Sequence, residues 1–218
     1  MPGSLLARSI APESSRHRFS DQHWDLRHVT ELEVNLSLWR RKPIDSVERE
    51  VAGLRATDLP DVRCRTSPPT FDADMGVLLK GRGLDPQAFD DWRADLRRLA
   101  DLFFALCGGR DVTARLETTD VDGCPRFHVD RTHLRLLCTY RGPGTEWLTD
   151  AQVDRDALAS GAPNEGIIRF GEPRRFEPFW VGILKGDAYP GNAGRGLVHR
   201  SPPIAGSGQT RVLFCLDC

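Results

Sequence analysis

The sequence predicts an α+β fold in which N-terminal helices pack on a β core of the jelly-roll type. Two observations lead to this prediction. In the first half of the chain, apolar residues recur at the spacing of amphipathic helices. After Gly109 they alternate in short segments separated by Gly, Pro, Asn and Asp, and little helical spacing remains. Many short strands without helices between them are typical of a β-sandwich or a jelly roll.

The composition is that of an ordinary globular protein and disfavours several classes of partner. The 218 residues suffice for one large domain, and 30 Lys and Arg against 31 Asp and Glu give a net charge of −1. We therefore expect neither nucleic acid nor membrane as a partner. The longest strongly apolar run, Leu102–Cys107, is too short to span a bilayer, and residues 1–20 lack an apolar stretch of signal-peptide length. We expect a cytoplasmic protein, and the oligomeric state stays open.

The chain divides into three segments by composition and periodicity. Residues 1–20 are rich in Ser, Arg and Pro and are expected to form a disordered arm. Residues 21–109 are predicted to be mainly helical and to form one compact domain with the β core at residues 110–218. The strands expected in that core lie at residues 111–119, 126–130, 133–140, 145–148, 166–170, 179–185, 196–200 and 211–217.

Two helices are predicted in the first half. Asp45 with a glutamate three positions later matches a capping box, and an apolar stripe follows. A longer helix is predicted to begin at Asp85, where a capping residue precedes proline, and to end at Gly108. Residues 60–85 hold Pro, Asp and Gly and are expected to form an irregular connection.

One predicted strand carries a pair of side chains suited to a metal ion. Side chains alternate in direction along a strand, so His128 and Asp130 of the H-V-D stretch point the same way. An imidazole and a carboxylate side by side are two members of the 2-His-1-carboxylate set that binds Fe(II). Taken alone, the pair fits an ordinary strand better than a metal site.

The rest of the chain offers a third ligand. The histidines at positions 17, 23 and 28 precede the β core, and His133 lies across a probable turn from His128. His199 lies on a late strand, which a jelly roll would bring back beside an early one. Arg211 opens the next strand, where a buried arginine would bind a carboxylate through two parallel hydrogen bonds. An exposed arginine at the end of a strand is the simpler reading of Arg211 alone.

The stretches "HVD", "RLLCTYRGPGTEWL" and "VGILKGDAYPGNAGRGLVHRSPPIAGSGQTRVLFCLD" together resemble the Fe(II)/2-oxoglutarate oxygenases of the double-stranded β-helix (cupin-like) fold. The pattern of that family is H-x-D, a turn of small residues after the next strand, a distant His and a basic residue on the following strand. This resemblance covers about Asp120 to Asp217. Over nearly the whole chain, "CTYRGPGTEWL" and "HRSPP" also resemble a bacterial family known only as a domain of unknown function, which implies no activity.

The oxygenase resemblance implies a set of site residues and cofactors. His128, Asp130 and His199 would be the iron ligands, and Arg211 would hold the distal carboxylate of 2-oxoglutarate. The residues that would assist Arg211 are Tyr140, or Arg135 on the other face of the same strand. The segment from His199 to Arg211 is slightly longer than usual in the family, which loosens the alignment of Arg211. Lys185 on the preceding strand is a competing carboxylate partner. The protein would be a dioxygenase acting on an unknown small molecule or protein.

Two alternatives remain open at this point. The first is a cupin-like protein that binds metal, such as zinc, without oxygenase activity. Cys124 is expected on the same side as His128, and a thiolate would favour zinc over iron. Cys138 offers a second thiol. The second alternative is a binding domain without enzymatic activity. We expect the six cysteines to be thiols or ligands rather than disulfides, and the terminal Cys215-x-x-Cys218 to be structural.

Overall fold

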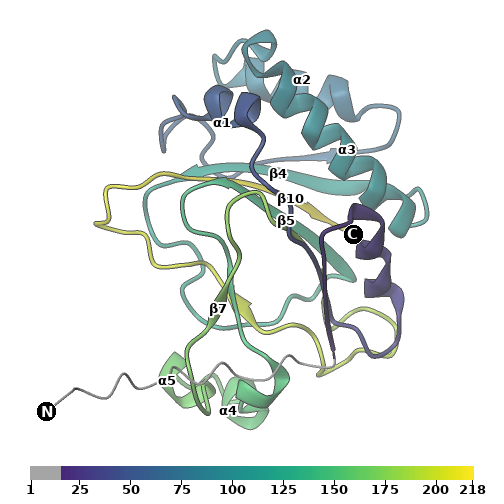
Figure 1. Cartoon of the computed structure of the whole chain (residues 1–218), viewed down its shortest axis with the longest axis vertical. Helices are drawn as coiled ribbons and strands as arrows, with labels where there is room; N and C mark the ends of the chain where they lie inside the picture. Colours follow the sequence, from purple (N-terminus) through teal and green to yellow (C-terminus); the bar gives the residue numbers. More distant parts are fainter. Residues whose placement is uncertain (1–15) are drawn as a thin grey trace, which may run out of the picture.

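The computed structural model describes residues 16–218, and two β-sheets form its centre (Figure 1). Residues 1–15 of the predicted arm lie outside the described part. The prediction of disorder is wrong for the end of the arm, because His17–Ser20 form strand β1. This strand pairs in parallel with β2 (Leu36–Trp39). Phe19 anchors it by packing on Trp147, with ring centroids 6.4 Å apart.

The larger sheet has seven strands in the order β1-β2-β8-β5-β10-β4-β3. Its pairs are antiparallel except for β1 with β2. The register between β10 and β5 shifts at Val212/Leu213, where the ladder is irregular. The remaining strands of this sheet are β3 (Val62–Thr66), β4 (Val112–Thr119), β5 (Leu134–Arg141), β8 (Val181–Lys185) and β10 (Arg211–Asp217).

The smaller sheet is antiparallel and has the order β7-β6-β9. Its strands are β6 (Glu146–Trp147), β7 (Arg174–Arg175) and β9 (His199–Arg200). An isolated antiparallel bridge joins His128 to His199 at its edge. The predicted strand at 126–130 is reduced to this bridge, and the bridge places the H-x-D stretch directly beside the distant histidine.

Helices cover the outer face of the larger sheet (Figure 1). The predicted long helix begins as a short 3₁₀ turn, η2 (Pro86–Phe89), whose N-cap Asp85 accepts a hydrogen bond from the backbone of Gln87. It continues as α3 (Asp90–Leu106). The other helices of the first half are η1 (His23–Thr30), α1 (Asp45–Val51) and α2 (Phe71–Gly81).

Parts of the first half differ from the prediction. The expected irregular connection at 60–85 is wrong, because it holds β3 and α2. The buried residues of α2 include Phe71, Met75 and Leu78, whose spacing is helical. The segment 21–109 is also less helical than predicted, since it supplies β2 and β3 to the larger sheet.

The two faces of the larger sheet bury different cores. Even-numbered residues of β5, such as Leu136 and Tyr140, pack with the helices in one large cluster that includes Trp92 of α3. On the other face, Leu137 packs with Trp147 of the smaller sheet. This layering confirms an α+β fold with N-terminal helices packed on a β core.

A third small cluster lies on the outer side of the smaller sheet. It contains Phe127 and Val198 together with Val153 and Ile167. The short helices η3 (Asp150–Gln152), α4 (Arg155–Ala159) and α5 (Asn164–Ile167) surround it, at the end of the molecule opposite α1 and α2 (Figure 1). The strand expected at 166–170 is therefore wrong apart from a single bridge, Val153 to Ile168.

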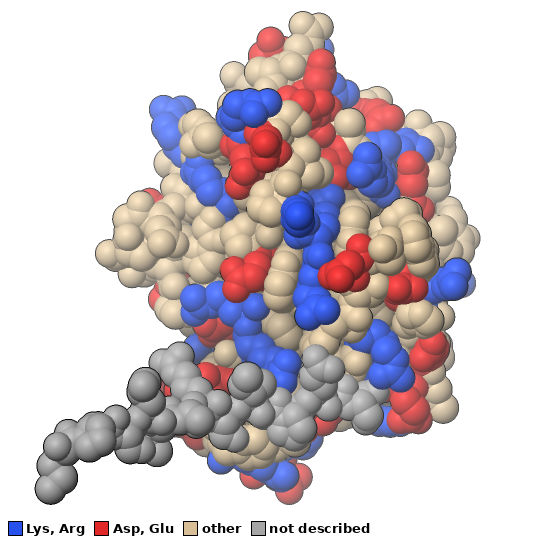
Figure 2. All heavy atoms as spheres, viewed as in Figure 1, with Lys and Arg blue, Asp and Glu red and all other residues tan. Residues whose placement is uncertain are grey.

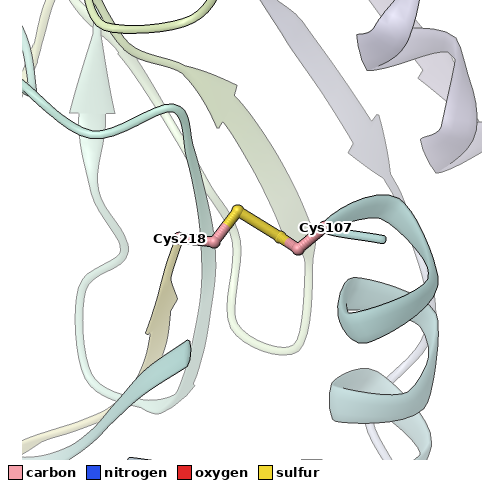
Figure 3. Close-up of a disulfide and its surroundings, with 2 residues drawn as sticks. All are labelled: Cys107 and Cys218. Carbon is pink, nitrogen blue, oxygen red and sulfur yellow. A yellow bond between two sulfur atoms is a disulfide. The ribbon is translucent and has the colours of Figure 1, made fainter. Parts of the chain in front are cut away.

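A disulfide joins Cys107, just after α3, to Cys218, just after β10 (Figure 3). The Cα atoms are 6.5 Å apart, within the ordinary range for a disulfide. The expectation that the cysteines are thiols or ligands is wrong for this pair. The other four cysteines, at positions 64, 124, 138 and 215, are free.

The described surface carries both signs of charge. Acidic and basic side chains are interspersed over the face shown in Figure 2. Within residues 16–218, none of the helices is long and apolar enough to cross a membrane.

Candidate metal centre

Three of the predicted site residues meet between the two sheets. One ligand atom from each of His128, Asp130 and His199 lies within 4.8 Å of the other two. The backbone brings them together, because His128 and His199 exchange two N–H···O=C hydrogen bonds of 3.0 Å. Asp130 follows His128 by two positions and therefore points to the same side.

Backbone contacts set the direction of both imidazoles. The Nδ1 atom of His128 lies 2.9 Å from the carbonyl of Arg126, and that of His199 lies 3.1 Å from the carbonyl of Leu197. A carbonyl accepts only, so each Nδ1 carries a hydrogen, and in the neutral form of such an imidazole the Nε2 atom has the lone pair that can bind a metal. Both Nε2 atoms face Asp130, at 3.9 Å from Oδ1 and 3.4 Å from Oδ2 respectively.

The two oxygens of Asp130 have different surroundings. Oδ1 accepts a hydrogen bond of 2.6 Å from Arg135. Oδ2 is buried and has no hydrogen-bond partner among the described residues. A buried, unpartnered carboxylate oxygen is costly, and a bound cation would satisfy it. Two atoms about 2.1 Å from one metal ion, at angles of about 90–110°, lie about 3.0–3.4 Å apart. The 3.4 Å between Asp130 Oδ2 and His199 Nε2 fits this geometry.

Burial keeps His199 neutral. It lowers the pKa of His199 to about 4, although the carboxylate of Asp130 opposes the shift. A neutral imidazole is the form that binds a metal. The donor set of two imidazoles and one carboxylate, with one side open to a cavity, therefore fits a divalent transition metal.

A cavity of about 200 Å³ is lined by the two histidines, His128 and His199, and by Arg211. Arg211 is 3% exposed and donates hydrogen bonds to the hydroxyls of Thr145, at 2.9 Å, and Thr139, at 3.4 Å. Its Nε atom is buried without a partner among the described residues. Burial lowers the pKa of Arg211 to about 10, so the guanidinium is charged at neutral pH. The expected simpler reading, an exposed strand-end arginine, is wrong.

Arg211 differs from the other arginines of this cavity. Each of the other arginines that line the cavity forms an ion pair with an Asp or Glu: Arg63, Arg115, Arg135 and Arg200. Arg211 forms no ion pair with any residue between 16 and 218. Burying a cation outside an ion pair is costly. The carboxylate of Glu117 offsets part of this cost from a distance, and an anionic ligand in the cavity would offset more of it. Thr145, which sequence reasoning missed, supplies a hydroxyl at the same place.

The structure does not bring Tyr140 to the cavity. Tyr140 points to the helix side of β5, where its hydroxyl donates a 2.7 Å hydrogen bond to Asp95. The strand period explains this placement, because Arg135 and Tyr140 are an odd number of positions apart and face opposite ways. Lys185 is also elsewhere, since its amine donates to the carbonyl of Glu31 at 2.7 Å.

Arg135 lines the cavity, but its guanidinium is already used. It donates to both oxygens of Asp217, at 2.5 and 3.0 Å, and to Asp130 at 2.6 Å. Arg135 therefore supports the side chain of a proposed ligand, Asp130. It has no pair of N–H groups left to bind a carboxylate of a bound molecule, contrary to the expectation that it would assist Arg211.

The structure brings no cysteine into the three-residue cluster. Cys124 is exposed and lines the same cavity, outside the set of ligand atoms. Cys138 lies on the helix side of β5, where its sulfur is 3.5 Å from a guanidinium nitrogen of Arg41. His133 lies away from the site as expected, and its backbone N–H donates to the carbonyl of Cys218.

Comparison with known proteins identifies the family of the chain. Residues 20–217 match the family described as "Protein of unknown function (DUF1826)", so the chain belongs to that family. This match confirms the resemblance to a family of unknown function. No curated protein matches the chain.

One solved structure shares the fold of this chain, and two others match it with lower scores. The dioxygenase for auxin oxidation 1 from Arabidopsis thaliana, in a binary complex with 2-oxoglutarate, matches with a TM-score of 0.53 at 9% identity, over 92% of this chain and 91% of that one. A full-length Neurospora crassa protein in complex with alpha-KG gives 0.47 at 12% identity, over 93% and 83%. A prolyl-4-hydroxylase from Pseudomonas putida gives 0.36 at 12% identity, over 80% and 93%. The first match shows a shared fold, and the other two scores are too low to support an argument.

Proposed function

We propose that this protein is an Fe(II)/2-oxoglutarate-dependent oxygenase with a double-stranded β-helix core. The observation that carries the proposal is a single cavity, lined by His128 and His199 of the three-residue cluster and by Arg211, a buried arginine that forms no ion pair with the described residues. In the reaction of this class, a substrate C–H bond, O₂ and 2-oxoglutarate give a hydroxylated product, CO₂ and succinate. Each O₂ molecule supplies one oxygen atom to the product and one to succinate.

The proposed ligands are the Nε2 atoms of the two histidines and Oδ2 of Asp130. Three protein ligands on one side of an octahedral ion leave three positions open. Iron bound there supplies the redox chemistry with O₂, while the protein binds and orients the reactants. The backbone carbonyls behind both imidazoles fix their orientation, so the ligands are arranged before a metal arrives.

Arg211 is proposed to bind the distal carboxylate of 2-oxoglutarate. A planar guanidinium matches a carboxylate through two parallel hydrogen bonds, and exclusion of water strengthens them. The hydroxyl of Thr145 adds a donor beside it. The Arabidopsis structure that shares this fold is a complex with 2-oxoglutarate, which supports the same cosubstrate for this chain.

The test is anaerobic addition of Fe(II) and 2-oxoglutarate to the full chain. We expect a weak visible absorption band, which arises when 2-oxoglutarate chelates Fe(II), and its loss in His199→Ala. His133→Ala is the matched control, because His133 lies outside the cavity and should keep the band. Absence of the band from the unaltered protein would refute the proposal. Stoichiometric zinc in the protein as isolated, with no response to 2-oxoglutarate, would instead favour a metal-binding protein without oxygenase activity.

A further inference from the structure

We infer that Arg135 and Asp217 are positioning residues that hold Asp130 as a one-oxygen metal ligand and so couple the metal site to the end of β10. This inference rests on the proposed metal site. It assigns a role to two charged residues that are not among the three proposed ligands.

Arg135 joins Asp217 and Asp130 in one network of charged hydrogen bonds. Arg135 on β5 lies directly opposite Asp217 on β10 in the sheet register. Two guanidinium nitrogens of Arg135 bind the two oxygens of Asp217, at 2.5 and 3.0 Å. The third nitrogen binds Oδ1 of Asp130 at 2.6 Å. The side chains of Arg135, Asp217 and Asp130 are only 18%, 16% and 9% exposed, so solvent screens these contacts weakly.

This arrangement selects which oxygen of Asp130 is available. Oδ1 is held by the guanidinium, whereas Oδ2 is the unpartnered atom facing His199. A carboxylate held in this way offers one oxygen to a metal. A carboxylate free to rotate would be able to offer both oxygens and occupy a coordination position that the cosubstrate and O₂ need.

Asp217 also sets how strongly Arg135 acts on Asp130. The cation of Arg135 is shared between two carboxylates, so it does not form an exclusive ion pair with the metal ligand. Without Asp217, the guanidinium would lose the two bonds that fix its plane, and its whole charge would face Asp130. Both changes would make Asp130 a poorer ligand, because outer partners orient ligands and tune their basicity.

Backbone and covalent contacts hold Asp217 in place. The next residue, Cys218, donates to the carbonyl of Leu134 and accepts from the N–H of His133, at 3.1 and 2.9 Å. Its side chain is bonded to Cys107 beyond α3 (Figure 3). The end of β10 is therefore fixed on both sides of the strand, which makes Asp217 a firm anchor for Arg135.

The experiment is a titration of the full chain with Co(II), whose visible spectrum reports the number and arrangement of ligands. For Asp217→Asn we expect a roughly 10- to 100-fold weaker affinity, the usual effect of removing an outer partner of a metal ligand, and an altered spectrum. Asp61→Asn is the matched control. Asp61 lines the same cavity and pairs with Arg63 and Arg115, without contact to Asp130. This control should keep the affinity and the spectrum of the unaltered protein.

Two further variants make the outcome decisive. Arg135→Met removes the contact to Asp130 directly and should alter the Co(II) spectrum, whereas His199→Ala should abolish it. Unaltered affinity and spectrum in a folded Asp217→Asn protein would overturn the positioning role. If Arg135→Met does not fold, Asp217→Asn alone decides, because the exchange keeps the side-chain shape. Two further results would contradict the proposal: the unaltered protein gives no Co(II) spectrum, or it gives one that persists in His199→Ala. In either case the proposed metal site itself is wrong, and the positioning role fails with it.

Discussion

Replacing Arg211 by methionine should weaken cosubstrate binding and raise stability at the same time. Arg211 is buried in the cavity, with hydroxyl partners but no carboxylate partner among the described residues. Methionine fills similar space without a charge to desolvate. A residue kept for binding, at a cost to folding, should show these opposite effects.

The stability change follows from the pKa of Arg211. Burial lowers this pKa from 12.5 to about 10, which corresponds to about 3 kcal/mol of destabilisation of the charged form. Because the folded-state pKa is the lower one, this cost is fully present at every pH well below 10. Loss of the hydrogen bond to Thr145 offsets about 1 kcal/mol of the gain. The net gain of about 2 kcal/mol should raise Tm by about 4–8 °C.

The binding change is larger and of opposite sign. Removing one partner of a buried charge pair costs at least about 2 kcal/mol. The Kd for 2-oxoglutarate should therefore rise by about 30-fold or more. Anaerobic calorimetry with Fe(II) present measures this Kd, and thermal unfolding without ligands measures Tm.

Arg200→Met is the matched control for this prediction. Arg200 lines the same cavity but is paired with Glu146, which is itself buried. The control should not gain stability, because it leaves Glu146 with one fewer cationic partner. A lower Tm for Arg211→Met together with an unchanged Kd would refute the reasoning and make Arg211 a structural residue.

Three more predictions address other parts of the molecule. Tyr140→Phe should lower the free energy of unfolding by about 1–3 kcal/mol, because buried Asp95 loses a donor, and should leave the Fe(II)/2-oxoglutarate band unchanged. Replacing Cys107 and Cys218 together by serine should cost up to about 4–5 kcal/mol, the entropic effect of a loop of about a hundred residues, seen as a lower denaturation midpoint. Burial lowers the pKa of His17 to about 4, so stability should fall as pH drops from about 6.5 towards 4, and His17→Gln should reduce that fall in denaturant titrations.

Each of these predictions has an outcome that contradicts it. Loss of the absorption band in Tyr140→Phe would place Tyr140 at the site after all. A Cys64→Ser protein, which removes a free thiol, should unfold near the midpoint of the unaltered chain, and an equal loss there would remove the special role of the disulfide. A pH profile unchanged in His17→Gln would show that His17 does not stay neutral in the folded state.

The candidate site was predictable because two of its residues are close in sequence and few histidines compete for the third position. The period of a strand places His128 and Asp130 on one side, and only one histidine, His199, lies late in the β core. Which of Arg135 and Tyr140 faces the cavity was not predictable. Strand β5 is buried on both faces, so the alternation shows that these two residues diverge but not which direction is inward.

The missed parts of the fold have similar physical causes. Helix α2 follows a segment rich in Pro and Thr, which is typical of a loop. The helical spacing that begins at Phe71 was therefore overlooked. Strand β2 is only four residues long, and its consecutive burial gives no period of two. The pairing of Cys107 with Cys218 depends on where α3 and β10 end in space, which spacing along the chain does not reveal.

The disulfide also has a topological consequence. It closes a covalent ring from Cys107 to Cys218, and the proposed ligands and Arg211 all lie inside that ring. A single cut of the backbone in the segment between β8 and β9 would therefore leave one covalent molecule. Protease-treated protein should migrate as one species on a denaturing gel without a thiol and as two fragments with one.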